Sequence, residues 1–297
     1  MKLDEFSANK RFVAVREARV AYFEAGAGEP VLLLHGCPFS SYIWRRIIPR
    51  LAAHHRCLAP DLLGLGDTET PADADWSLRA QAAMIVGFLD ALGIERTHVV
   101  GHDHGGAVAQ LLAAEHPDRL DRLVLMNAEA YDNWPSQKER PLIRLVQAPL
   151  LGSLALWLWS RRPVLRLTLI EGKAVHNPQV LTPDLLDGYA RANLSDRHRR
   201  RKTRRFVAGQ FDHAHNQVTT ELLEGLRRFR HPTLLIWATD DPHFGPEWGR
   251  RLQEDIPGAV RLELLPETGH LLMEERPERV ADLIDGFLAE ALVRRAG

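Results

Sequence analysis

The sequence predicts an α/β fold with a mostly parallel central sheet flanked by helices and with an inserted helical cap. Short apolar runs alternate with helical patterns along much of the 297 residues, which is the rhythm of strand-helix-strand units. One run, Val31-Leu32-Leu33-Leu34, is apolar at every position, as expected for a strand buried on both faces. Between residues 128 and 229 the strand rhythm disappears, and a segment of this length predicts a helical lid rather than a simple crossover.

The predicted elements follow in order along the chain. Apolar or alternating runs predict strands at residues 12–15, 19–23, 31–34, 57–60, 97–100, 123–126, 233–237 and 260–265. Apolar residues at helical spacing predict helices at residues 41–53, 78–92, 107–112, 183–193 and 277–291. We therefore expect a core domain made of residues 1–127 and 230–297, and a cap domain made of residues 128–229.

Composition and charge argue against several classes of protein. The formal net charge of -1 predicts no overall attraction to nucleic acid or to an anionic membrane. Because Cys37 and Cys57 are the only cysteines and residues 1–11 have no apolar stretch, we expect a reduced, cytoplasmic protein without disulfides. The apolar run 149–159 is too short to span a bilayer and predicts a buried or cavity-lining helix. The basic run 197–205 has no interleaved aromatic residues, which favours a solvated helix face over a nucleic-acid site.

The stretch Gly101-His102-Asp103-His104-Gly105-Gly106 is the most informative motif of the chain. It follows an apolar β-branched pair and leads into a helical pattern, which predicts a strand, a very tight turn and a helix, the geometry of a nucleophile elbow. The central residue is Asp103 rather than serine. A carboxylate nucleophile attacks an sp3 carbon and forms an alkyl ester with the enzyme. The alternative is an ordinary strand-to-helix loop in which Asp103 caps the helix.

Three other positions extend this site. His35-Gly36-Cys37-Pro38 follows a central strand and predicts a loop that turns a backbone N–H inward as half of an oxyanion hole, or else a plain turn. Asp241 and His270 each follow a predicted strand, at the edge where parallel sheets bind ligands. The order nucleophile, acid, histidine is that of an α/β-type hydrolase triad. The alternatives are a helix cap for Asp241 and a surface loop for His270, and Asp240 is the rival for the acid.

These motifs resemble the Asp-nucleophile branch of the α/β-hydrolase superfamily, which holds haloalkane dehalogenases and epoxide hydrolases. The resemblance covers nearly the whole chain except the lid. The 35–38 loop is similar to the His-Gly-X-Pro loop of the family, and residues 101–106 are similar to its elbow. Residues 40–45 and 55–64 are most similar to dehalogenases. Asn127 is typical of a dehalogenase subgroup in which the acid comes late in the chain, as Asp241 does here.

The resemblance implies a mechanism that needs no cofactor and no metal. Asp103 attacks the carbon that bears the leaving group, and His270, oriented by Asp241, activates the water that hydrolyses the ester. Backbone N–H groups of Cys37 and His104 hold the oxyanion. The implied partners are a small apolar organic substrate and water, and the protein is expected to be a monomer or a homodimer without nucleic-acid or membrane partners.

The residues available to stabilise the leaving group differ from those of both subfamilies. Dehalogenases usually carry an indole donor directly after the nucleophile and Asn or Glu in the His-Gly-X-Pro loop, where this chain has His104 and Cys37. Halide stabilisation would then fall to His104 or to a lid tryptophan, Trp157 or Trp159, unless these tryptophans only form the lid core.

The other pocket candidates and the alternative functions follow from the same resemblance. Epoxide hydrolases use two lid tyrosines, and this lid offers Tyr131 and Tyr189, the latter expected to pack in a helix. His35, Asn127 and Tyr189 complete the predicted substrate pocket. The leading expectation is haloalkane dehalogenation, the alternative is epoxide hydrolysis, and a third hypothesis is a non-catalytic ligand-binding protein.

Overall fold

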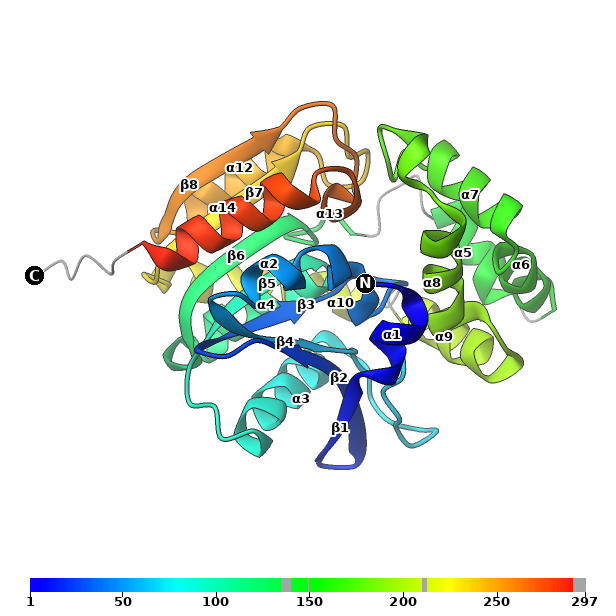
Figure 1. Cartoon of the computed structure of the whole chain (residues 1–297), viewed down its shortest axis with the longest axis horizontal. Helices are drawn as coiled ribbons and strands as arrows, with labels where there is room; N and C mark the ends of the chain where they lie inside the picture. The colour runs from blue at the N-terminus through cyan, green and yellow to red at the C-terminus, as the bar shows by residue number, and fades with distance from the viewer. Residues whose placement is uncertain (135–139, 149, 210–212, 291–297) are drawn as a thin grey trace, which may run out of the picture.

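A single mixed sheet forms the centre of the molecule (Figure 1). The computed structural model describes residues 1–134, 140–148, 150–209 and 213–290. Within these ranges the sheet has eight strands in the order β1-β2-β4-β3-β5-β6-β7-β8. The strands are β1 (Lys10–Val15), β2 (Ala18–Ala25), β3 (Glu29–Leu34), β4 (His55–Pro60), β5 (Thr97–Asp103), β6 (Leu120–Ala128), β7 (Thr233–Ala238) and β8 (Ala259–Leu265). β2 pairs antiparallel with β1 and β4, and the remaining pairs are parallel, which confirms the predicted fold class.

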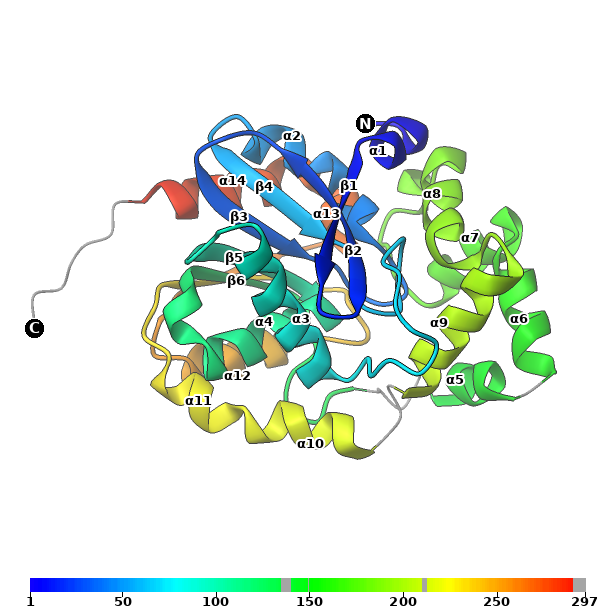
Figure 2. The same ribbon diagram turned by 90° about the horizontal axis from the view of Figure 1, so that it is seen from below.

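Helices lie on both faces of this sheet (Figure 2). The α-helices are α1 (Leu3–Ala8), α2 (Ile48–Leu51), α3 (Leu78–Ala91), α4 (His104–Glu115), α5 (Arg140–Gln147), α6 (Leu151–Trp159), α7 (Arg162–Glu171), α8 (Pro183–Leu194), α9 (Arg197–Gly209), α10 (His213–Glu221), α11 (Leu223–Arg228), α12 (Pro246–Asp255), α13 (Leu272–Glu275) and α14 (Pro277–Ala289). Short 3-10 helices are η1 (Ser41–Arg46), η2 (Pro117–Arg119) and η3 (Pro178–Val180). In the described part of the chain, no single helix is long and apolar enough to cross a bilayer.

The two faces of the sheet bury two separate apolar cores. Side chains alternate along β3, so that Leu32 and Leu34 pack into the core under α3, α4 and α12, whereas Val31 and Leu33 face η1, α2 and α14. Burial on both faces explains why the central strands are apolar at every position. The sheet is thereby fixed as a rigid platform for the loops at its carboxyl edge.

Two helical predictions differ from the structure. The predicted helix 41–53 is divided into η1 and α2, because Pro49 has no N–H for a continuous helix and instead occupies the first turn of α2. α1 was not predicted, since it is only six residues long and its helical apolar spacing is limited to Leu3 and Phe6.

Within the predicted lid segment 128–229, the helices divide between two neighbourhoods. α5 to α9 lie together beside the carboxyl edge of the sheet, whereas α10 and α11 run along the core (Figures 1 and 2). α11 packs closely on α4, where a Cβ added to Gly225 would lie 2.6 Å from the Cβ of Ala114. The group α5 to α9, which we call the cap, therefore covers the edge where the site residues end.

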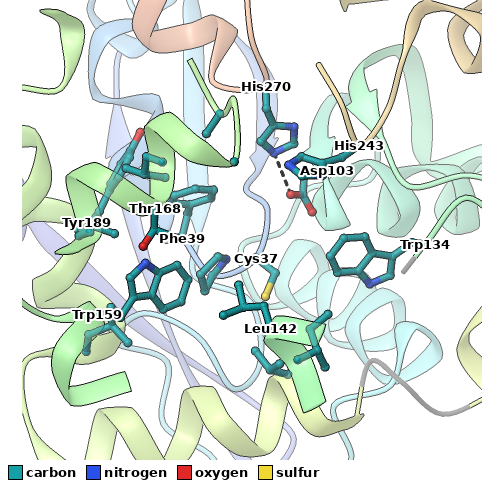
Figure 3. A pocket seen from close by; sticks show the side chains of 18 of the residues that line it. Cys37, Phe39, Asp103, Trp134, Leu142, Trp159, Thr168, Tyr189, His243 and His270 are labelled. Carbon is teal, nitrogen blue, oxygen red and sulfur yellow. Dashed lines mark hydrogen bonds and ion pairs between the residues drawn. The ribbon is translucent and has the colours of Figure 1, made fainter. Parts of the chain in front are cut away.

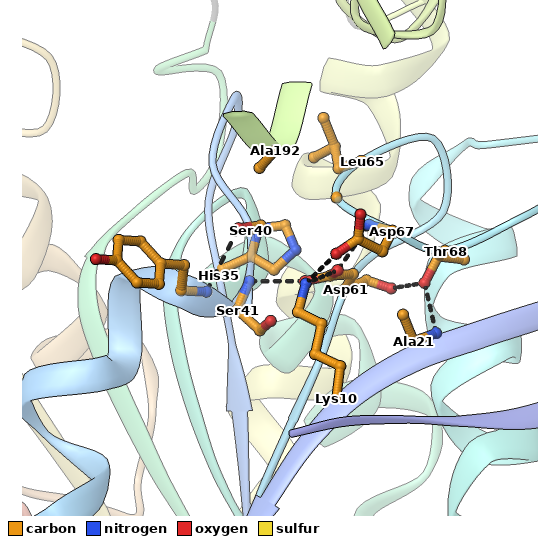
Figure 4. Close-up of polar contacts among 12 residues, drawn as sticks. Lys10, Ala21, His35, Ser40, Ser41, Asp61, Leu65, Asp67, Thr68 and Ala192 are labelled. Atoms are coloured by element: carbon orange, nitrogen blue, oxygen red, sulfur yellow. Dashed lines mark hydrogen bonds and ion pairs between the residues drawn. The ribbon is translucent and has the colours of Figure 1, made fainter. Parts of the chain in front are cut away.

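A buried polar cluster joins the cap to the core (Figure 4). Nζ of Lys10 lies 2.5 Å from Oδ2 of Asp61 and 2.8 Å from Oδ2 of Asp67. From α9, Arg199 donates to Oδ1 of Asp67 at 2.7 Å, and Lys202 donates to the carbonyl of Gly66 at 2.8 Å. The basic run is therefore not simply a solvated helix face, because Arg199, Lys202 and Arg205 all bind the loop that follows β4.

Candidate active site

Asp103 lies at the end of β5, where the chain reverses into α4. Its backbone has φ +55° and ψ −123°, a region that non-glycine residues rarely adopt. The turn is tight because Gly105 packs on β3, where an added Cβ would lie 2.3 Å from the carbonyl oxygen of Leu34. The predicted strand, tight turn and helix are thus present at this motif, and Asp103 reaches a cavity under the cap.

The structure brings Asp103, His270 and Asp241 together. Nε2 of His270 lies 3.0 Å from Oδ2 of Asp103, and its Nδ1 lies 2.8 Å from Oδ2 of Asp241. All three residues are buried. The helix-cap alternative accounts only for Oδ1 of Asp103, which accepts from the backbone N–H of His104, and leaves the contact with His270 unexplained.

Asp241 is held by backbone and side-chain donors. Its Oδ1 accepts hydrogen bonds from the N–H groups of His243 and Phe244 at 2.8 and 3.1 Å. Its Oδ2 accepts from the side-chain amide of Asn127 at 2.9 Å. Asn127 was predicted in the substrate pocket, but it does not line the cavity and instead holds the acid.

Asp240, the rival for the acid, faces another way. Its Oδ2 lies 2.7 Å from Nδ1 of His176, and 43% of its side chain is exposed. Asp241 therefore occupies the position beside His270, as the spacing after the strand predicted.

Burial and charge shift the pKa values of all three groups. Burial raises the pKa of Asp103, while the hydrogen bond from His270 opposes this shift. Burial alone would lower the pKa of His270, but the charge of Asp241 and hydrogen bonds to both carboxylates raise it to about 10. Burial disfavours the charge on Asp241, yet the charge of His270 and its hydrogen bond hold the pKa of Asp241 at about 2. The two carboxyl groups therefore favour the protonated form of His270.

The loop of residues 35–38 packs against Asp103. A Cβ added to Gly36 would lie 2.5 Å from the Cβ of Asp103, so only glycine permits this approach. Cys37 lines the cavity, and burial together with the charge of Asp103 raises the pKa of its thiol well above the usual value. The backbone N–H of His104 already contacts a carboxylate oxygen, whereas the N–H of Cys37 as a second oxyanion donor stays a prediction.

The side chains of His104 and His35 were predicted at the substrate and lie elsewhere. Nδ1 of His104 lies 3.2 Å from the buried carboxylate of Glu129, and its ring packs edge-on against Phe206. Nε2 of His35 accepts from the N–H of Leu62 at 3.0 Å, and burial lowers the pKa of His35 to about 4. Neither ring lines the cavity, so neither His104 nor His35 offers a side-chain donor to a leaving group there.

A cavity of about 190 Å³ opens in front of Asp103, and most of its walls are apolar (Figure 3). Trp159 and Tyr189 line it, as predicted. The hydroxyl of Tyr189 donates to Oε1 of Glu274 at 2.7 Å and is thereby occupied. The prediction for Trp157 is wrong, because this side chain is 41% exposed on the outer side of α6.

Among the lining residues that the sequence did not predict, two carry aromatic ring nitrogens. Trp134, in the loop after β6, and His243, two residues after Asp241, both line the cavity. Figure 3 shows His243 beside Asp103 and His270. The available signal was the position of each ring in a loop at the carboxyl edge of the sheet, close in sequence to Asn127 or to the acid. The indole nitrogens of Trp134 and Trp159 are buried and have no hydrogen-bond partner among the described residues.

The chain is similar to known enzymes over almost its whole length. Haloalkane dehalogenase 2 of Mycobacterium tuberculosis is 30% identical over 277 residues, which cover 90% of each chain. A cis-3-alkyl-4-alkyloxetan-2-one decarboxylase of Shewanella oneidensis is 27% identical over 95% of this chain and 88% of its own length.

Solved structures of enzymes also resemble this chain over almost its whole length. The haloalkane dehalogenase DbeA from Bradyrhizobium elkani is 26% identical, with a TM-score of 0.78 over 94% of this chain and 97% of its own. The epoxide hydrolase CorEH is 26% identical, with a TM-score of 0.74 over 94% and 98%. The family model of the alpha/beta hydrolase fold matches residues 29–277. The chain therefore belongs to the α/β-hydrolase superfamily and is a hydrolase of this fold.

Proposed function

We propose that the protein hydrolyses carbon–halogen bonds of small apolar haloalkanes through a covalent ester on Asp103. The observation that carries the proposal is the contact of a buried carboxylate, at the end of β5, with His270 at the wall of an apolar cavity. An aspartate in this position forms a stable alkyl ester only with an sp3 carbon, which favours alkyl substrates over carboxylic esters.

In the first step, a carboxylate oxygen of Asp103 attacks the carbon from the side opposite the halogen. The C–O bond forms while the carbon–halogen bond breaks, and the electron pair leaves with the halide ion. The N–H of His104, which contacts Oδ1, limits rotation of the carboxylate, so that the nucleophile is already oriented.

In the second step, His270 removes a proton from water, and the resulting hydroxide attacks the ester carbonyl. Esterification removes the negative charge of Asp103, which is one of the interactions that raise the pKa of His270. The pKa of His270 therefore falls once the ester forms, which favours the neutral imidazole that acts as the base. The products are an alcohol, a halide ion and one proton.

Two indole N–H groups are candidate hydrogen-bond donors to the halide. Trp134 and Trp159 both line the cavity with nitrogens that have no partner among the described residues. Two other polar side chains at the wall are less suitable, because Tyr189 is bonded to Glu274 and Thr168 donates to the carbonyl of Val164. A halide accepts hydrogen bonds from uncommitted N–H donors, which is the role the indoles fit.

Epoxide hydrolysis is the second candidate, and His243 is the observation that favours it. Opening an epoxide leaves an alkoxide that must receive a proton. The tyrosines of the lid segment are not placed for this, because Tyr189 is bonded to Glu274 and Tyr131 to Asp255. His243 lines the cavity beside Asp103, which places a ring N–H donor where that proton is needed (Figure 3). The similarity to CorEH supports the same candidate.

A substrate panel separates these candidates. The purified protein is incubated with short 1-bromoalkanes and 1-chloroalkanes, with terminal epoxides, and with a cis-3,4-dialkyl β-lactone, the substrate type named for the Shewanella oneidensis relative. Release of bromide or chloride supports dehalogenation, diol formation supports epoxide hydrolysis, and alkene with carbon dioxide identifies lactone decarboxylation. Absence of all products, with no covalent adduct on a His270→Ala variant, would favour the non-catalytic hypothesis.

A further inference from the structure

The outer surface of the cap exposes an unusual number of large apolar side chains. Twelve large hydrophobic residues are exposed in the described part of the chain, and nine of them lie between residues 142 and 167. Those that face outward at helical spacing form what we call the cap apolar face, made of Leu145, Leu151, Leu154, Leu158, Val164 and Leu167. Exposed apolar clusters of this kind mark interaction surfaces.

The face belongs to three consecutive helices at the edge of the molecule. Leu151, Leu154 and Leu158 follow one side of α6, and Val164 and Leu167 follow one side of α7. Figures 1 and 2 show α6 and α7 at the side of the cap farthest from the sheet. No other element of the described protein covers this side, since Leu151 and Leu167 are 60% and 58% exposed.

The charge along the three helices of this face is positive. Residues 140–170 contain five arginines and no aspartate or glutamate. Arg162 is paired with Asp187, whereas Arg140, Arg144 and Arg166 have no ion pair among the described residues. The guanidinium of Arg161 lies 4.3 Å from the ring centre of Trp157, at the border of the face. Leucine and tryptophan beside arginine is the pattern of helices that lie in the interface of an anionic membrane.

A second copy of this chain fits the face poorly. A twofold dimer places the same patch on both subunits, so that the arginines of one copy would face those of the other. An anionic lipid surface instead supplies apolar chains for the leucines and negative headgroups for the arginines. The net charge of -1, from which no membrane attraction was expected, averages this local positive patch over the whole chain.

The same helices also form a wall of the cavity. Ile143, Leu165 and Leu169 line the cavity from α5 and α7, on the sides opposite the cap apolar face. Leu142 lines the cavity and is 42% exposed, which links the two surfaces. Docking through the face would bring this part of the cavity close to the apolar phase of a bilayer.

We infer that the cap apolar face docks on an anionic lipid bilayer, with α6 and α7 lying in the membrane interface. The docking rests on the outer surface of the cap and is independent of the reaction proposed for Asp103.

Cosedimentation of the full-length protein with vesicles tests the inference. Binding is expected to vesicles of phosphatidylcholine with phosphatidylglycerol, and to be weaker with phosphatidylcholine alone or at high salt. The double variant Leu151→Gln/Leu154→Gln is expected to bind at least about tenfold more weakly, since each leucine loses its burial in lipid. Val260→Gln is the matched control, because Val260 is 63% exposed on β8 and lies outside the cap.

An arginine double variant and a matched control test the electrostatic contribution to membrane binding. Arg144→Gln/Arg166→Gln is expected to reduce affinity by roughly 25-fold, at about fivefold for each arginine near an anionic surface. Arg250→Gln, at an exposed position on α12, is expected to bind like the wild type. Circular dichroism and thermal unfolding check that each variant is folded, and a misfolded one is replaced by Leu167→Gln or by Arg140→Gln.

The depth at which Trp157 lies in the bilayer gives a second readout that does not depend on binding affinity. Lipids with a spin label near the headgroup are expected to quench part of the tryptophan fluorescence of the wild type, and Trp157→Phe is expected to remove that quenching while leaving binding intact. Absence of vesicle binding by the wild type, or equal binding by the leucine and control variants, overturns the inference. It is also overturned if light scattering shows a dimer that the leucine variant abolishes and that vesicles do not dissociate.

Discussion

The side-chain amide of Asn127 donates a hydrogen bond to Oδ2 of Asp241 at 2.9 Å, the same oxygen that accepts from His270. Asn127 also donates to the carbonyl of Phe244 and accepts from the N–H of Ala238. One buried amide therefore ties β6 to β7 and fixes the carboxylate that orients His270. Asn127 acts through Asp241 and is a positioning residue.

Replacing Asn127 by alanine is expected to lower kcat by roughly tenfold with little change in KM, because Asp241 loses a donor and two buried backbone groups lose partners. The free energy of unfolding should fall by about 1–3 kcal/mol. A purely structural role would leave the pH profile of kcat unchanged, whereas a positioning role shifts its acidic limb. Steady-state kinetics across pH distinguish the two, and an unchanged kcat and pH profile would contradict the assignment.

Replacing His270 by alanine is expected to stop the reaction after the first step. The ester on Asp103 then accumulates, because no base activates water. Mass spectrometry of the variant after exposure to a 1-bromoalkane should show an added alkyl group on the peptide that contains Asp103. An unmodified peptide, with halide release intact, would argue for direct hydrolysis by water.

Substitutions at two adjacent aspartates test which of them is the acid of the triad. Asp241→Asn is expected to lower kcat by roughly 10³- to 10⁴-fold, because His270 loses its charged partner. Asp240→Asn should leave kcat near the wild-type value, since Asp240 is paired with His176 at the surface. Equal effects of the two substitutions on kcat, with both variants folded, would remove the basis for choosing Asp241.

The three lid tryptophans form another matched set. Trp134→Phe and Trp159→Phe are each expected to lower kcat/KM for bromoalkanes by roughly 10- to 100-fold, the effect of losing a hydrogen bond to a charged group. Trp157→Phe should have no such effect, because Trp157 lies outside the cavity. If all three variants behave alike, the halide is held by another donor, and His243→Phe becomes the next variant to measure.

Stability is expected to fall as the pH rises from neutral to alkaline values. The pKa of His270 is raised from 6.5 to about 10 in the folded protein, so its proton favours the folded state below pH 6.5. This contribution is lost as the pH rises from 6.5 through about 10. Urea unfolding at several pH values should therefore show a steeper loss of stability for the wild type than for His270→Ala, and parallel curves would contradict the assigned shift.

The strands of the sheet and the positions of the three site residues along the chain were predictable because both depend on local sequence patterns. Each of the eight predicted strands falls within an observed strand, since apolar runs such as that of β3 can be buried only in the sheet centre. The glycines around Asp103 predicted its place in a tight turn. Asp241 and His270 were predicted because each comes directly after a predicted strand.

The cavity was harder to predict because it depends on packing between distant elements. Trp157 and Trp159 differ by about 200° around a helix, so the sequence shows that they face opposite ways but not which of them faces the cavity. His104 turns away because Glu129 and Phe206 bind its ring, and neither contact has a sequence signal. His243 was missed because its role depends on the loop after Asp241 folding back over Asp103.

A single turnover in water enriched in heavy oxygen tests the ester on Asp103 most directly. With protein in excess over a 1-bromoalkane, the ester mechanism transfers an ordinary oxygen of Asp103 to the alcohol, while the heavy oxygen from water enters the carboxylate. We predict an unlabelled alcohol and a labelled Asp103 peptide. A labelled alcohol with an unlabelled peptide would show that water attacks the substrate directly and would contradict the account.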